Sequence, residues 1–323
     1  MSKYDVNVSG AVCTVQVIKL HSMPIVGQSE TVINPESCMT MWMGGCSYNI
    51  WKALAKLGAK TCPVFHCSSP LCYENMLKDC DEVGAEKKYI TYPLNENYYH
   101  CIMFQNDDNE HITISMPYGK DVKDPTKSMN ALSYLPEQFD CKYVLAAVSA
   151  DDTWLDLAEK NGCEIIFSYR NDPVLCPKEM MEKLMYKSHY IFMNEVEAEY
   201  VCKTLKLKSI TDLLVHGRAE VVVTTLGKEG SLVYFVKEDG SVGCERVGIT
   251  EAPGGCVDAV GAGDGFVAGF TYGLIEGKNI RTCAQFGHTV SSFVIEKEGS
   301  VTNVPSLEQM LERNATRKDA SFD

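Results

Sequence analysis

A regular alternation of short apolar runs with amphipathic segments, between residues 142 and 225, limits the fold of this chain more than any other feature. The apolar runs have the length and β-branched composition of strands, and the segments between them repeat with the period of an α-helix. This order predicts an α/β fold with a mostly parallel central sheet flanked by helices. The expected strands are 143–148, 164–167, 190–193 and 221–225, and the expected helices are 153–161, 177–187, 195–206 and 209–216.

The flanking segments extend this pattern. Residues 4–20 alternate apolar and polar positions, as one strand or a pair of strands does, and 61–67 is a further expected strand. A turn at Gly44-Gly45 opens a helix that ends at Gly58. Further helices are expected at 73–84, about 262–277 and 279–296. We expect one domain over residues 1–313 and a disordered polar tail over 314–323.

Two β-rich runs, 98–105 and 111–116, are separated by the polar residues 106–110. Polar turn residues between two such runs are typical of a hairpin. We expect this hairpin to stand outside the main sheet.

Charge and cysteine usage exclude several classes of partner. The chain has 30 Lys and Arg against 43 Asp and Glu, a net charge of −13, so a nucleic-acid polymer or an anionic membrane surface is not the expected partner. No apolar run is long enough for a membrane helix, and the first residues do not resemble a signal peptide. The 15 cysteines are an odd number and indicate a reducing, cytoplasmic setting in which they pack as small apolar residues.

The strongest candidate site lies in residues 252–266, where Gly261-Ala262-Gly263 falls at the start of an expected helix. Unpaired N–H groups at a helix start carry partial positive charge, and glycine lets an anion approach them. Asp264 follows directly, and a carboxylate there can remove a proton from a hydroxyl while the N–H groups stabilise a transferred phosphoryl group. The alternative is that Asp264 is an acidic first-turn residue favoured by the helix dipole. Neither a P-loop, a dinucleotide fingerprint nor the protein-kinase signatures are present, which also argues against a nicotinamide oxidoreductase.

Four segments together resemble the landmarks of the ribokinase-like (PfkB) carbohydrate and nucleoside kinases, in that family's order. They are Gly44-Gly45 with Asn49, Asn194-Glu195-Val196-Glu197, Thr225-Leu226-Gly227-Lys228-Glu229-Gly230, and Asp258-Ala259-Val260-Gly261-Ala262-Gly263-Asp264. The resemblance implies ATP-dependent transfer of the γ-phosphoryl group to a hydroxymethyl group of a nucleoside or sugar, and a small β-sheet lid on the ribokinase-like fold.

The resemblance also implies roles for individual residues. Asp264 would be the general base, and Gly261, Ala262 and Gly263 the anion hole. Asn194 and Glu197 would organise Mg²⁺ and phosphate through water, with Asn194 also in the ATP site. Asp258 would start a loop that binds a monovalent cation such as K⁺. The implied ATP-site residues further include Thr225, Gly227 and Gly230, and the implied acceptor-site residues are Gly44, Gly45 and Asn49, to which we add Gln16.

The implied lid consists of segments at about 26–43 and 97–117. In the family it closes over the acceptor, which excludes water, and such lids also pair two copies of the chain.

Several of these residues also have a purely structural explanation. Gly44-Gly45 could form only a tight turn, Asn49 could hydrogen-bond locally, Glu197 could be a solvated helix carboxylate, and Thr225-Leu226-Gly227 could be a strand end and turn. The first strand also departs from the family, because Val15 stands where members usually carry an Asp that binds acceptor hydroxyls. This change motivates an alternative function, a non-catalytic homologue that binds a metabolite as a regulatory or interaction module.

Overall fold

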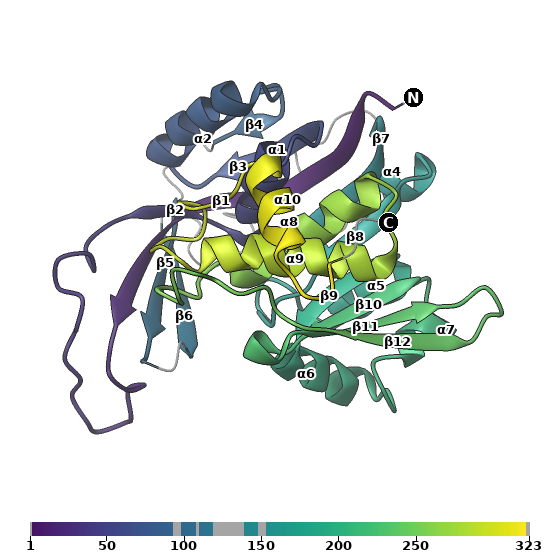
Figure 1. Cartoon of the computed structure of the whole chain (residues 1–323). Coiled ribbons are helices and arrows are strands. Elements are labelled where there is room, and N and C mark those ends of the chain that lie inside the picture. Colours follow the sequence, from purple (N-terminus) through teal and green to yellow (C-terminus); the bar gives the residue numbers. More distant parts are fainter. Residues whose placement is uncertain (1, 93–97, 108–109, 119–138, 148–152, 321–323) are drawn as a thin grey trace.

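The computed structural model describes residues 2–92, 98–107, 110–118, 139–147 and 153–320 (Figure 1). Its main sheet has the strand order β12-β11-β10-β9-β8-β7-β1-β3-β4, and its central strands run parallel. The expected α/β fold is therefore confirmed. The strands of the main sheet are β1 Tyr4–Lys19, β3 Thr61–Cys67, β4 Ile90–Thr91, β7 Cys141–Ala147, β8 Glu164–Ser168, β9 Tyr190–Asn194, β10 Val221–Thr225, β11 Ser231–Val236 and β12 Val242–Val247.

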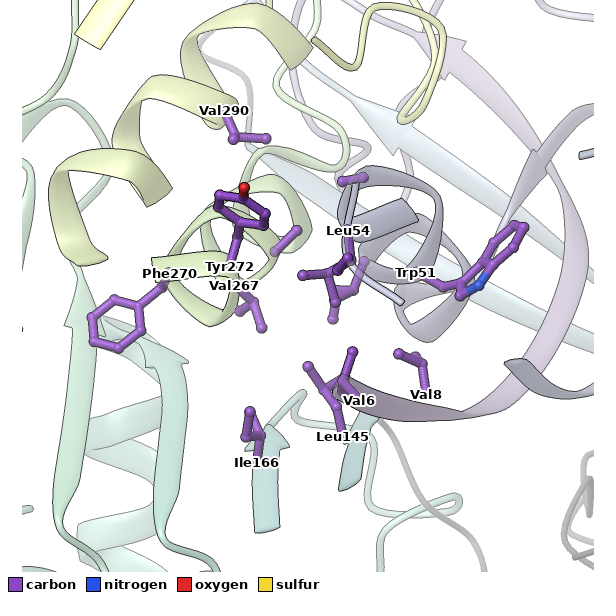
Figure 2. Close-up of a cluster of buried hydrophobic side chains, with 14 of the residues drawn as sticks. Val6, Val8, Trp51, Leu54, Leu145, Ile166, Val267, Phe270, Tyr272 and Val290 are labelled. Carbon is purple, nitrogen blue, oxygen red and sulfur yellow. The ribbon is translucent and has the colours of Figure 1, made fainter. Parts of the chain in front are cut away.

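Helices cover both faces of this sheet. Alternate residues of β7 belong to different cores: Leu145 packs with α1 and α8, whereas Val144 packs with α4 to α7. Figure 2 shows the first of these cores, in which Trp51 and Leu54 of α1, Val267 of α8 and the strand residue Val6 belong to one cluster of buried side chains. The helices are α1 Cys46–Lys56, α2 Pro70–Val83, α4 Thr153–Lys160, α5 Lys178–Lys187, α6 Glu195–Leu205, α7 Asp212–His216, α8 Ala262–Ile275, α9 Ile280–Val294 and α10 Leu307–Ala315.

β1 is one continuous strand of 16 residues that belongs to two sheets. Its first half lies between β3 and β7, and its second half pairs with β2 (Trp42–Gly44) and β5 (Tyr98–Gln105). In Figure 1 its dark ribbon leaves the main sheet and runs into the lid. Even-numbered residues such as Val8 and Val12 face the first core, so the odd-numbered residues face the opposite side.

The expected hairpin is present outside the main sheet, as β5 paired with β6 (His111–Tyr118). The other lid segment differs from the expectation, because between residues 26 and 43 only Trp42 and Met43 lie in a strand. Gly27 and Pro35 interrupt the pairing that a strand would need. The side chain of Asn34 instead ties this segment to β1, since it accepts from Lys19 N–H and donates to the Val17 carbonyl.

The C-terminal region is more ordered than its composition suggests. Ser306 and Gln309 form a capping box that begins α10, and Asn314 near its end is fully buried. Arg317 then donates to the Thr250 hydroxyl at 2.6 Å and the Gly248 carbonyl at 3.0 Å. The structure therefore differs from a tail that begins at residue 314. Within the described residues, no helix has the length and apolar character needed to cross a bilayer.

Candidate active site

The sequence-predicted residues converge on one cavity of about 350 Å³ between the main sheet and the lid. It opens where β8, β9 and β10 end and where α1 and α8 begin, and the lid strands cover its other side. Ten of the predicted residues line it: Gly44, Gly45, Asn49, Asn194, Glu197, Thr225, Gly227, Gly261, Gly263 and Asp264.

The start of α8 is built around Gly261. Its φ of 82° lies in the left-handed region, and a Cβ there would come within 2.5 Å of the Ser300 Cβ. The Ala262 N–H donates to the Ala259 carbonyl. The N–H groups of Gly263 and Asp264 have no partner inside the helix, so these two, rather than that of Ala262, are open toward an anion.

A chain of hydrogen bonds holds the Asp264 carboxylate in place. Asn49 Nδ2 donates to Asp264 Oδ2 at 2.7 Å, and Ser300 Oγ donates to Asn49 Oδ1 at 2.9 Å. Asn49 itself is buried in the first turn of α1. The side-chain amide of Asn49, which the resemblance implies for the acceptor site, therefore also orients the Asp264 carboxylate.

Burial raises the pKa of Asp264 from 3.8 to about 6. The hydrogen bond from Asn49 and the positive charge of Arg170 act in the opposite direction, because both favour the ionised form. A carboxylate with a pKa near 6 is ionised at neutral pH yet basic enough to accept a proton from an alcohol during a reaction.

The N-x-x-E motif forms the capping box of α6. Asn194 Oδ1 accepts from Glu197 N–H, and Glu197 Oε2 accepts from Asn194 N–H, each at 2.8 Å. The second carboxylate oxygen accepts from Asn171 N–H at 3.3 Å. Burial raises the pKa of Glu197. The motif thus fixes the start of α6 at the cavity wall.

The T-x-G turn follows β10. Thr225 ends the strand, Gly227 begins the short 3₁₀ segment Gly227–Glu229, and both line the cavity. Gly230 closes the turn and does not belong to the cavity wall. Two of the three residues that the resemblance implies for the ATP site, Thr225 and Gly227, therefore line the cavity.

Of the predicted acceptor-site residues, Gln16 does not line the cavity, and Gly44 lines it but packs against Val15. Gln16 lies on the opposite face of β1 from Val15, donates to the Met39 sulfur at 3.6 Å, and is not a cavity residue. Because strand side chains alternate, Val15 can line the cavity only if Gln16 does not. The space above Gly44 is filled by Val15, whose Cγ2 would lie 2.5 Å from an added Cβ. Gly45 has a φ of 112° and lets α1 approach the Ala11 carbonyl.

Asp258 is buried outside the cavity wall and ties three segments together. Its Oδ1 accepts from Val260 N–H at 3.0 Å and from Gln105 of the lid at 3.3 Å, and its Oδ2 accepts from Gly299 N–H at 3.1 Å. Lys19, at the end of β1, donates to the neighbouring Val257 carbonyl. The lid is thereby connected to the loop that precedes α8.

Arg170 is the main cavity residue that the sequence pattern did not indicate. It lies two residues beyond the end of β8, and its Nη1 is 3.7 Å from the Cys46 sulfur. Its position after a parallel strand was the available signal, because ligands gather at the carboxyl ends of such strands.

Comparison with known proteins defines the class. The model of the pfkB family carbohydrate kinases matches residues 14–307, and the chain belongs to this family. The expected phosphotransferase with an alcohol acceptor is confirmed at this level.

The similar proteins include several nucleoside kinases. A nucleoside kinase of Methanocaldococcus jannaschii is 28% identical over 243 residues, which are 75% of this chain and 74% of that protein. Its crystal structure has a TM-score of 0.77 at 22% identity and covers 97% of this chain and 98% of its own. Burkholderia thailandensis nucleoside kinase in complex with inosine has a TM-score of 0.77 at 21% identity, with 96% and 97% covered. A Cryptococcus neoformans ribokinase in complex with ADP has a TM-score of 0.76 at 18% identity, with 96% and 99% covered. These structures confirm the ribokinase fold.

Proposed function

We propose that the protein transfers the γ-phosphoryl group of ATP to a hydroxymethyl group of a nucleoside or sugar, with Asp264 as general base. The observation that carries this proposal is the carboxylate itself, which Asn49 holds at the start of α8 and whose pKa is about 6. In the reaction Asp264 accepts the hydroxyl proton while the acceptor oxygen bonds to the γ-phosphorus. The bond between this phosphorus and the β–γ bridging oxygen breaks, and ADP leaves.

The start of α8 stabilises the charge that builds on the phosphoryl group. The open N–H groups of Gly263 and Asp264 lie beside the base, and the helix dipole favours an anion there. Gly261 keeps the turn that aims these groups at the cavity. Base and anion hole are then adjacent, as a phosphoryl transfer from ATP to an alcohol requires.

In this proposal the donor nucleotide binds along the cavity wall formed by Thr225 and Gly227, beside Asn194, the N-cap of α6. Glu197 fits a role toward Mg²⁺ through water, since hard carboxylate oxygens suit this ion and both are already held by backbone N–H groups. When bound, Mg²⁺ neutralises charge on the β- and γ-phosphates.

The implied K⁺ does not fit the side chain of Asp258. Its two oxygens accept three hydrogen bonds from Val260, Gln105 and Gly299, and the side chain is buried. In this proposal Asp258 joins the lid, the loop before α8 and the Gly299 turn, and no step depends on a monovalent cation.

An acceptor screen tests the kinase proposal. Purified protein is incubated with Mg-ATP and nucleosides, pseudouridine, ribose, fructose or keto-deoxy acids, and phosphorylated products are measured by mass spectrometry. We expect ADP to appear together with one phosphorylated acceptor. Transfer to none of these acceptors, with ligand binding retained, would instead support the non-catalytic alternative.

We also propose that two copies pair through the outer face of the lid. Three apolar side chains of β6 are exposed there, and β6 pairs only with β5 among the described strands, which leaves an open edge. These side chains are Ile112, Ile114 and Met116.

The dimer is tested by light scattering after size-exclusion chromatography. We expect a dimer for the unaltered protein and a monomer for Ile114→Asp, because a carboxylate would be buried in the shared face. Ile249→Asp is the matched control, since Ile249 is 48% exposed, close to the 47% of Ile114, but lies outside the lid. A monomer before substitution, or a dimer that survives Ile114→Asp, would contradict this proposal.

A further inference from the structure

Arg170 carries a half-buried positive charge that has few hydrogen-bond partners. Its guanidinium lies between the main cavity and a side pocket of about 50 Å³. Among the described residues, the hydrogen-bond partner of this group is the Cys46 thiol, 3.7 Å from Nη1. A guanidinium has five N–H donors and stays charged at all relevant pH values, so one weak thiol contact leaves most of them open.

Each carboxylate near Arg170 accepts at least one hydrogen bond from another group. Asp264 accepts from Asn49, and both oxygens of Glu197 accept from backbone N–H groups. Asp172, at the side pocket, accepts from the N–H groups of Val174 and Leu175 through Oδ1. These carboxylates reduce the cost of burying the guanidinium by their charge, but their hydrogen bonds hold other groups.

The Thr113 hydroxyl is a second polar group without a hydrogen-bond partner, and it indicates a ligand beside Arg170. Thr113 Oγ1 is buried without a hydrogen-bond partner, and Thr113 lines both the main cavity and the side pocket. A buried hydroxyl without a partner is costly, and native proteins rarely retain one unless a ligand or water completes it. Arg170 and Thr113 come from different parts of the fold, the end of β8 and the lid, and face one small space.

The rest of this space is apolar or carries neutral thiols. Cys13, Cys46 and Cys101 line it. A hydrogen bond with Cys101 and burial raise the pKa of Cys13, and burial raises the pKa of Cys46 to about 12, so both thiols stay protonated at neutral pH. Val15 adds a branched apolar side chain to the adjoining cavity wall. The local surroundings therefore offer hydrogen-bond donors to an anion, and the one carboxylate that the described residues contribute to the side-pocket wall, that of Asp172, already accepts from the Val174 and Leu175 N–H groups through Oδ1.

We infer that the acceptor is a hydroxy acid whose carboxylate occupies the side pocket between Arg170 and Thr113, while its hydroxyl group reaches Asp264. This inference rests on the proposed kinase function and narrows its acceptor class. The volume of about 50 Å³ holds roughly three water-sized atoms, which matches a carboxylate and excludes a phosphate ester. A planar guanidinium can bind a carboxylate through two parallel hydrogen bonds, and Thr113 can add a third.

The competing role for Arg170 is to bind the γ-phosphoryl group. The side pocket argues against it, because its wall comes from β1, the start of α1, the end of β7, the lid and residues 170–175. Asn194, Thr225 and Gly227, which mark the proposed ATP end, are not part of that wall. Arg170 thus borders the acceptor end of the cavity.

Matched pairs of acceptors that differ in one group test the inference. D-gluconate is compared with D-glucitol, and D-glycerate with glycerol, under saturating Mg-ATP. We expect the acid of at least one pair to have the lower KM. Arg170→Gln should raise the KM for that acid about 10- to 100-fold and change kcat little, and Thr113→Val should act in the same direction with a smaller effect. Arg218→Gln is the control, because Arg218 is 49% exposed and paired with Glu159 at the surface.

Binding without ATP separates this inference from the kinase proposal. Gluconate or glycerate should raise the melting temperature of the unaltered protein and of Asp264→Asn, but not that of Arg170→Gln, whose circular dichroism must match the parent. Binding of an acid without phosphorylation would contradict the kinase proposal but would still support the anion site. The inference is overturned if no acid binds, or if Arg170→Gln lowers kcat equally for acids and neutral acceptors, which would assign Arg170 to the phosphoryl group.

Discussion

Asp264→Asn is expected to lower kcat by at least about 100-fold while it makes the protein more stable at pH 8. The asparagine amide keeps an oxygen that can accept the hydrogen bond from Asn49, so the geometry of the site is retained. It cannot accept a proton, and the acceptor hydroxyl then has no base. Initial rates of ADP formation at saturating acceptor measure the loss.

The stability gain follows from the pKa of Asp264, which burial raises from 3.8 to about 6 in the folded protein. The folded state therefore holds this proton more tightly than the unfolded chain, and the stability from this group is present below about pH 4 and lost as the pH rises through 6. Asparagine removes that loss, which amounts to about 1–3 kcal/mol at pH 8. Thermal unfolding should show the gain at pH 8 and almost none at pH 4.

The same pKa sets the pH dependence of the unaltered enzyme. The proposed mechanism requires an ionised Asp264, so kcat/KM should fall about tenfold per pH unit below pH 6 and level off above it. An Asp264→Asn protein with unchanged turnover would contradict the assignment of the base. One that is inactive but also less stable at pH 8 would show that the carboxylate has a structural role.

Gly261→Ala is expected to reduce both stability and activity strongly. The added Cβ would lie 2.5 Å from the Ser300 Cβ and 2.9 Å from the Ser300 carbonyl oxygen, and the φ of 82° is strained for alanine. Ser300 cannot yield freely, because its hydroxyl binds Asn49, which in turn orients Asp264. We expect a loss of about 1–3 kcal/mol in unfolding free energy and at least about tenfold in kcat.

Gly263→Ala is the matched control, two residues along the same segment. An added Cβ there meets no atom within 4 Å, and Gly263 lies in the helix, where alanine is favourable by up to about 1 kcal/mol. This variant should unfold no more easily than the parent. If it nevertheless loses activity, the phosphoryl group approaches the Gly263 N–H closely. Equal destabilisation by both substitutions would contradict the backbone argument for Gly261.

The sequence predicts the main sheet well because its central strands are buried on both faces and its helices keep a clear period. Antiparallel β11 and β12 were missed, since β12 is an edge strand, β11 lies next to it, and both carry mixed, partly exposed residues. Helix α10 was missed although Ser306 and Gln309 carry the spacing of a capping box. The segment 26–43 was overpredicted, because its apolar residues lie in the lid without forming a regular strand.

The residues of the candidate site likewise include some that the sequence could locate and some that it could not. Residues fixed by a helix start or a strand end, such as Asp264, Glu197 and Thr225, could be placed from the chain alone. The position of Gln16 could not be predicted, because the side of β1 to which its side chain points depends on how β1 pairs with the neighbouring strands. Arg170 and Thr113 could not either, since they meet through tertiary contacts between the end of β8 and the lid.

β1 is continuous from the core to the cavity, so the alternation of its side chains in the core half also determines which side chains line the cavity. Even positions such as Val6 and Val8 enter the core, and odd positions such as Cys13 and Val15 line the cavity. Inserting or deleting one residue between Val8 and Cys13 would exchange the two faces of the lid half while the core half stayed in place. Substitutions in the second half of β1 can therefore change the cavity wall without disturbing the core, whereas a change in the length of this strand would alter every cavity-facing position at once.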